Sequence, residues 1–244
     1  MSKFKFLVLI TLVSNSLLGQ TNDNYSDELL SSSFNAYMEV DYELAYNMFP
    51  FIKKRFLEHL KDTSSFANPY DSLSKHIDIR KTSNNLLKTY SWPVRDTSCC
   101  HRSVIYAQFK TASGDINFID LNETDGGDIF ITDLKMIEID NKPYYLILGW
   151  GTCCQGTHYA TAKIYEIKNG SLYKSEAMFN DKAYLSIGAN RGANRGAKID
   201  LKYSPEQKIL SYNSYGEGND SGFYGHEKNV VKWKLKNERF KRIN

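Results

Sequence analysis

The stretch Tyr159-Ala-Thr-Ala-Lys-Ile-Tyr-Glu-Ile-Lys-Asn-Gly-Ser-Leu-Tyr-Lys174 decides the fold of this 244-residue chain. Runs rich in Ile, Tyr and Thr stand on both sides of Asn169-Gly170, and such runs are typical of β-strands. Asn and Gly both tolerate the positive φ angles that a type I′ turn needs. We therefore predict a hairpin with strands at Tyr159–Ile167 and Leu172–Phe179.

The same pattern continues on both sides of this hairpin. Short runs rich in Val, Ile, Tyr and Phe are separated by turn residues, without intervening helical patterns. Strands this closely spaced favour an antiparallel meander, which can form an open sheet, a sandwich or a partial propeller. We therefore expect a mainly β fold with further strands at Leu86–Ser91, Ser103–Lys110, Ile116–Leu121, Ile129–Ile139, Tyr144–Gly149, Lys198–Tyr203, Ile209–Asn213, Val230–Lys236 and Arg239–Ile243.

The N-terminal part of the chain has a different periodicity. Between Ser26 and Lys61 the apolar residues recur at helical spacing, for example Leu30 and Phe34. Two helices are expected, and Pro50 should bend or begin the second because proline lacks an amide proton and clashes with the preceding turn. An N-terminal helical segment therefore precedes the β region.

The first 20 residues have the layout of a signal peptide. Lys3 and Lys5 precede an apolar run from Phe6 to Val13, and small and polar residues follow. This run is shorter than the ~20 residues that span a bilayer, so we expect no membrane span after signal removal. We predict a signal peptide at 1–20, a helical arm at 21–70 and an antiparallel β domain at 71–244, in a periplasmic or secreted protein.

The charge balance argues against nucleic acid as a partner. The chain carries a net charge of +3, of which Lys3 and Lys5 contribute two, so the exported chain is near +1. Nucleic-acid binding usually needs a concentrated basic footprint. The C-terminal lysines at 232, 234 and 236 alternate with Val231, Trp233 and Leu235, which is typical of the outer face of a strand.

The four cysteines occur in two adjacent pairs, Cys99-Cys100 and Cys153-Cys154. In an exported chain an even cysteine count favours disulfides, and four cysteines allow three connectivities. Two of these join the segments, and the third forms a vicinal bridge within each pair. One bond between the segments closes a long loop and should stabilise the fold by about 4 kcal/mol.

Metal binding and redox chemistry are the alternatives for these cysteines. His101 follows the first pair and His158 lies close after the second, so soft sulfurs and imidazoles stand in both segments. Structural zinc sites prefer cysteines two to four residues apart, because adjacent side chains on an extended chain point to opposite sides. We therefore favour structural disulfides and expect no metal and no cofactor.

The segment around the second cysteine pair is the best candidate for a functional loop. Trp150, His158 and Tyr159 flank two glycines that allow sharp backbone turns, and His101 is the further candidate. No nucleophile-elbow motif accompanies these residues, so no catalytic residue is assigned.

The residues Asp120, Asn122, Asp125 and Asp128 form a weak candidate for a cation site. Their spacing is similar to acidic calcium loops, in which alternate oxygens surround a hard cation. The third acid of the segment, Asp125, comes one residue late, which breaks the ligand register. An acidic hairpin loop is the simpler interpretation.

Three segments resemble a family of exported bacterial proteins in which a Tyr-Ser-Trp segment precedes a β meander. They are Phe66-Ala-Asn-Pro-Tyr-Asp-Ser-Leu73, Leu87-Lys-Thr-Tyr-Ser-Trp92 and Lys142-Pro-Tyr-Tyr-Leu-Ile-Leu148. Pro93 stands where the family usually has an acid. No activity is established for that family, so the resemblance implies export and β architecture alone.

These observations favour a non-enzymatic exported protein, a binding or envelope-associated β module stabilised by disulfides. The sequence identifies no partner, although an envelope protein or a glycan would suit such a module. The alternative is an extracytoplasmic enzyme or metal-binding protein centred on residues 150–159. The two hypotheses differ in whether the histidines and acids share one deep pocket.

Overall fold

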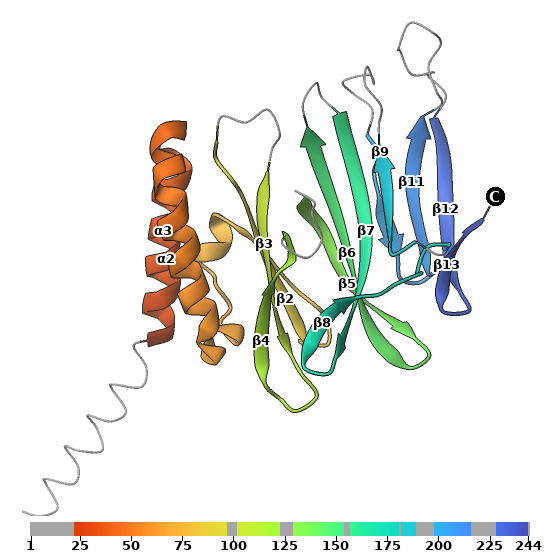
Figure 1. Cartoon of the computed structure of the whole chain (residues 1–244), viewed down its shortest axis with the longest axis horizontal. Helices are drawn as coiled ribbons and strands as arrows, with labels where there is room; N and C mark the ends of the chain where they lie inside the picture. The colour runs from red at the N-terminus through yellow and green to blue at the C-terminus, as the bar shows by residue number, and fades with distance from the viewer. Residues whose placement is uncertain are drawn as a thin grey trace, which may run out of the picture. The chain divides into compact units, whose positions relative to one another are not determined.

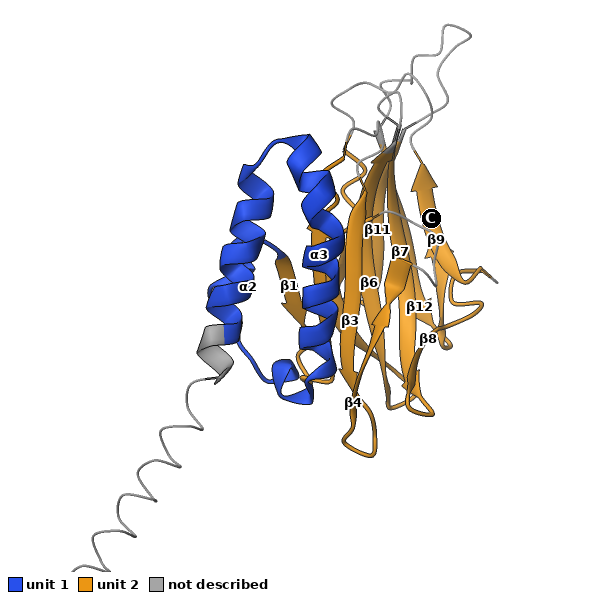
Figure 2. Ribbon diagram, turned by 60° about the vertical axis from the view of Figure 1, so that its left-hand side comes forward, with its two compact units in different colours: residues 1–77 blue, residues 78–244 orange. Residues whose placement is uncertain are grey.

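The computed structural model describes residues 22–96, 102–122, 129–153, 157–180, 182–188, 198–215 and 228–243. The chain divides into two units, residues 1–77 and residues 78–244, which Figure 2 colours separately. The first unit contains the helices and the second contains three antiparallel sheets (Figure 1). The prediction of a mainly β fold with an N-terminal helical segment is therefore confirmed. The predicted signal peptide lies outside the described residues.

The first unit is built on two helices, α2 (Asn22–Glu39) and α3 (Tyr42–Lys61). The Asp41 carboxylate caps α3 by accepting the backbone N–H of Leu44 at 2.8 Å, which satisfies a donor at the helix start. The rings of Phe34 and Phe56 pack edge to face with centroids 5.9 Å apart. Pro50 lies inside α3 and does not begin it. Among the helices of the described residues, none has the length and hydropathy of a membrane span.

The rest of this unit folds back onto the helices. It contains two short 3-10 helices, η1 (Thr63–Phe66) and η2 (Leu73–Lys75). The Asp27 carboxylate of α2 accepts the backbone N–H groups of Ser72 and Leu73, each at 2.9 Å. These charge-assisted hydrogen bonds hold the segment against α2.

The second unit contains three sheets, each of which is a meander. We name them sheets A, B and C in chain order. Sheet A consists of β1 (Asp78–Lys81), β2 (Leu87–Pro93), β3 (Ser103–Lys110) and β4 (Ile116–Asp120). Sheet B consists of β5 (Phe130–Ile139), β6 (Lys142–Cys153), β7 (Thr157–Lys168), β8 (Ser171–Lys174) and β9 (Tyr184–Gly188). Sheet C consists of β10 (Lys202–Ser204), β11 (Ile209–Tyr215), β12 (Lys228–Lys236) and β13 (Arg239–Ile243).

The predicted hairpin around Asn169-Gly170 is present as β7 and β8. Asn169 and Gly170 have φ angles of 50° and 76°, as a type I′ turn requires. The predicted strand Leu172–Phe179 is wrong beyond Lys174, because Ala177 adopts a φ of 56° and turns the chain. The next position along β7 is taken by β9, a strand that the sequence pattern did not predict.

Sheet B packs between the other two sheets and carries an apolar cluster on each face. Tyr145 and Ile147 of β6 belong to a cluster shared with sheet A, which we call the A–B core. Leu146 and Leu148, which alternate with them, belong to a cluster shared with sheet C, the B–C core. Alternation along the strand therefore supplies both cores.

A β-bulge in β5 keeps its apolar residues on the correct faces. The register with β6 shifts between Ile131 and Asp133. Before the bulge Ile131 faces the A–B core, and after it Leu134 faces the same core while Ile137 faces the B–C core. One extra residue reverses the inward and outward alternation, so the bulge corrects a pattern that would otherwise place apolar groups on the wrong face.

Candidate functional site

Three aromatic rings from neighbouring strands form a row on one face of sheet B. Phe130 on β5 is paired with Trp150 on β6, and their ring centroids are 5.7 Å apart. His158 on β7 stacks on the other side of Trp150, with centroids 5.8 Å apart and an angle of 21° between the ring planes. We call Phe130, Trp150 and His158 the aromatic row.

Strand register places the aromatic row. Thr152 is paired with His158, so His158 lies diagonally across from Trp150, within reach of an aromatic side chain. Further along the same face of β6 and β7, Leu148 and Ala162 are fully buried in the B–C core. Trp150 lies beyond that core and keeps 37% of its surface exposed. The row therefore continues a buried face to a point where it meets solvent.

His158 adds a polar nitrogen, Nδ1, to the aromatic row. Its Nδ1 is buried and has no hydrogen-bond partner within the described part of the chain. A buried polar atom without a partner costs free energy. The row therefore combines apolar ring surface with one polar group.

Tyr159 lies on the opposite face of sheet B from Trp150 and His158. It is paired with Gly151, and its ring covers that glycine so closely that a Cβ at position 151 would overlap it. Tyr159 packs against the A–B core. Of the predicted loop residues, the structure therefore brings Trp150 and His158 together and separates Tyr159 from them.

Most of the predicted cysteine site lies outside the described residues. Cys99, Cys100, His101 and Cys154 are in undescribed segments, and Cys153 is described only as the last residue of β6. The disulfide prediction therefore stays a prediction.

Asp120 and Asn122, the described half of the predicted cation loop, form hydrogen bonds with backbone groups in and beside sheet A. The Asp120 carboxylate accepts the N–H of Asn122 at 3.0 Å. The Asn122 side chain accepts the N–H of Ile105 at 2.8 Å and donates to the carbonyl of Ser103. Asp125 and Asp128 lie outside the described residues. In the described ranges, no three His, Cys, Asp or Glu side chains are arranged to hold a metal ion.

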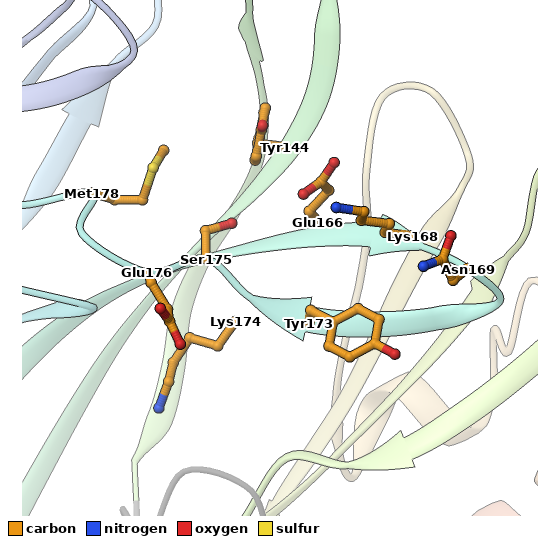
Figure 3. A pocket seen from close by; sticks show the side chains of 9 residues that line it. All are labelled: Tyr144, Glu166, Lys168, Asn169, Tyr173, Lys174, Ser175, Glu176 and Met178. Atoms are coloured by element: carbon orange, nitrogen blue, oxygen red, sulfur yellow. The ribbon is translucent and has the colours of Figure 1, made fainter.

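The structure also contains an open pocket of about 440 Å³ at the other end of β6 and β7. Its lining includes Tyr144, Glu166, Lys168 and Tyr173, with Met178 also in the wall (Figure 3). Burial, followed by the charges of Glu166, Glu238 and Asp140, raises the pKa of Tyr144 above its ordinary value. We call this the β6–β8 pocket.

Sequence reasoning did not find Phe130 or the residues of the β6–β8 pocket as site residues. Phe130 comes two residues after Asp128, but its contact with Trp150 depends on the register of β5 with β6. Glu166 meets Tyr173 only through the pairing of β7 with β8. The sequence signal for this pairing is the Asn169-Gly170 turn, because a two-residue turn fixes the register of its hairpin.

No protein-family model, curated protein or solved structure matches the chain.

Proposed function

We propose that this chain is an exported, non-catalytic binding module that holds its ligand against the aromatic row. The observation that carries the proposal is the exposed ring of Trp150, which lies between Phe130 and His158 and contacts both rings. Contacts on both sides fix the rings before a ligand arrives, so little side-chain entropy is lost on binding. Rigid aromatic side chains are also the usual anchors of binding surfaces.

A glycan is the ligand class that this surface suits best. The faces of aromatic rings carry negative charge density, and one face of a sugar ring presents C–H groups that pack against them. The imidazole of His158, a ring type whose nitrogens donate and accept hydrogen bonds, lies beside the ring of Trp150. The predicted signal peptide supports this ligand class, because polysaccharides are abundant outside the cytoplasm.

The proposal is tested with the mature chain, residues 21–244, produced in an oxidising compartment. Co-sedimentation with peptidoglycan sacculi, chitin and cellulose measures binding to insoluble glycans. Soluble fragments of any polymer that is bound are then titrated while tryptophan emission is recorded. Trp92 and Trp233 are buried, so a change caused by quenchers or glycans reports mainly on Trp150.

Two substitutions make this test specific. Trp150→Ala should weaken glycan binding about tenfold or more, since truncated aromatic anchors often cost about 2 kcal/mol or more. Tyr46→Ala removes an even more exposed ring from α3 and should leave binding unchanged. The proposal is overturned if the chain binds none of the glycans, or if Trp150→Ala binds them as tightly as the unaltered chain does.

A further inference from the structure

The β6–β8 pocket contains a carboxylate flanked by two tyrosines. Glu166 on β7 is paired with Tyr173 on β8. On its other side, Tyr165 is paired with Tyr145, so Tyr144 lies beside Glu166 on β6. Tyr144, Glu166 and Tyr173 therefore form a row across three neighbouring strands, and all three line the pocket (Figure 3).

The Glu166 carboxylate is half-buried and has no partner among the described residues. It makes no hydrogen bond or ion pair with them, although its charge reaches the neighbouring hydroxyl of Tyr144. An ammonium group placed here gains an ion pair and also the attraction of aromatic ring faces. This part of the pocket therefore suits a cation.

A lysine lies close to this carboxylate on the same strand face. Lys168 follows Glu166 by two residues, so their Cα atoms are about 6.6 Å apart on one side of β7. Its ammonium is exposed and makes no ion pair with a described residue. The other lysine of the lining, Lys174, lies with its Nζ 5.6 Å from the ring centroid of Tyr184. Lys168 is therefore the cation available to a ligand carboxylate.

We propose that the β6–β8 pocket binds a small zwitterion, a free amino acid or a short peptide. Its ammonium group lies against Glu166 between the rings of Tyr144 and Tyr173, and its carboxylate pairs with Lys168. Met178, which is buried in the pocket wall, contacts an apolar side chain of the ligand. The pocket volume is within the range of roughly 300–1,000 Å³ that is usual for small-molecule sites.

This site is separate from the aromatic row. Tyr144 and Trp150 are six positions apart on β6, which corresponds to about 20 Å along the strand. The two proposals therefore share no residue, and each can fail without the other.

The first experiment is isothermal titration calorimetry of the mature chain with L-leucine and glycyl-L-leucine. N-acetyl-L-leucine lacks the ammonium group and should bind about tenfold more weakly or not at all. L-leucine methyl ester lacks the carboxylate and should bind several-fold more weakly. No heat of binding for either zwitterion up to millimolar concentration overturns the proposal, as does equal binding of either blocked compound.

Substitutions then assign the groups. Glu166→Gln keeps the shape of the side chain and should weaken zwitterion binding about tenfold, while Lys168→Gln should weaken it several-fold. Glu138→Gln is the matched control, since Glu138 is an exposed acid of β5 that does not line the pocket. Trp150→Ala should leave zwitterion binding unchanged. Unchanged binding in Glu166→Gln, with the fold verified by circular dichroism, contradicts the proposal.

Discussion

The two ends of the β6–β7 hairpin carry different kinds of side chain on the same face of sheet B. At one end Trp150 and His158 stack as aromatic rings. At the other end Glu166 and Lys168 bring charges into a pocket (Figure 3). Between them, the same face is fully buried in the B–C core.

The buried middle explains why the ends can differ. Side chains such as Leu148 must fill space in a close-packed core, so their size and polarity are restricted. Residues beyond the core have only to follow the strand geometry that the core maintains. The ends of long strands are therefore where a β domain can vary its chemistry at little cost in stability.

Truncating a side chain in the buried middle of this face should cause the largest loss of stability. Leu148→Ala leaves a cavity in the B–C core and should lower the free energy of unfolding by about 2–5 kcal/mol. Urea unfolding followed by circular dichroism measures this loss. Val230→Ala is the control, because Val230 is exposed on β12 and its truncation should cost less than about 0.5 kcal/mol. Similar losses in the two variants would contradict the assignment of Leu148 to a packed core.

A smaller effect is expected at the aromatic end alone. A Cβ at Gly151 overlaps the Tyr159 ring, so Gly151→Ala should lower stability by about 1–3 kcal/mol. The exposure of the neighbouring Trp150, measured by acrylamide quenching, should change as well. Zwitterion binding in the β6–β8 pocket should stay unchanged.

Gly188 supplies the matched control for this substitution. It pairs with Tyr159 from β9, but a Cβ there has open space around it. Gly188→Ala should therefore change stability by less than about 0.5 kcal/mol. If both alanine variants are equally stable, Tyr159 does not pack against position 151 as described.

The middle of β7 also offers a stabilising change. The Oγ1 of Thr161 is buried and has no hydrogen-bond partner in the described chain, so it loses hydration without compensation. Thr161→Val keeps the shape and should raise the free energy of unfolding by about 1 kcal/mol. Denaturant titration measures the change, and a clear loss of stability would indicate a partner for this hydroxyl.

The smallest effect should appear at the charged end as a function of pH. The pKa of Tyr144 is raised, first by burial and then by the charges of Glu166, Glu238 and Asp140. The folded state therefore keeps this proton to higher pH than the unfolded state, and stability falls as pH rises above 10.0 toward the folded pKa. Glu166→Gln removes one of the charges, so it should lower the pKa of Tyr144 and weaken this fall.

Tyrosine ring-carbon NMR measures this titration residue by residue, with Tyr144→Phe to assign the signal. The pKa of Tyr203 is raised by burial alone, so Tyr203 should titrate identically in the Glu166→Gln chain. A Tyr144 titration that Glu166→Gln leaves unaltered would show that the two groups do not interact.

Much of the fold could be predicted from the sequence because alternation and turn chemistry are local. The Asn169-Gly170 turn identified the β7–β8 hairpin from two residues. The strand β9 was missed because it pairs with β7 across a turn at Ala177, a residue type that seldom adopts a positive φ. The bulge in β5 could not be predicted either, since it depends on which face meets which core.

The candidate site could be predicted only in part. Trp150 and His158 both belong to the predicted functional loop, but the contact between them requires the register of β6 and β7. Tyr159 belongs to the same predicted loop, although adjacent residues of a strand face opposite sides, so alternation alone separates it from His158. The row of Tyr144, Glu166 and Tyr173 joins three strands and leaves no local signal.

The bulge in β5 also has a consequence for cooperativity. Because β5 contributes to both the A–B core and the B–C core, this strand cannot detach without exposing apolar surface on two sides. Subglobal opening of one sheet alone therefore becomes costly, and the backbone amides of β5 and β6 should exchange with solvent only through global unfolding. The strands of such a domain resist proteases even when its loops are cleaved.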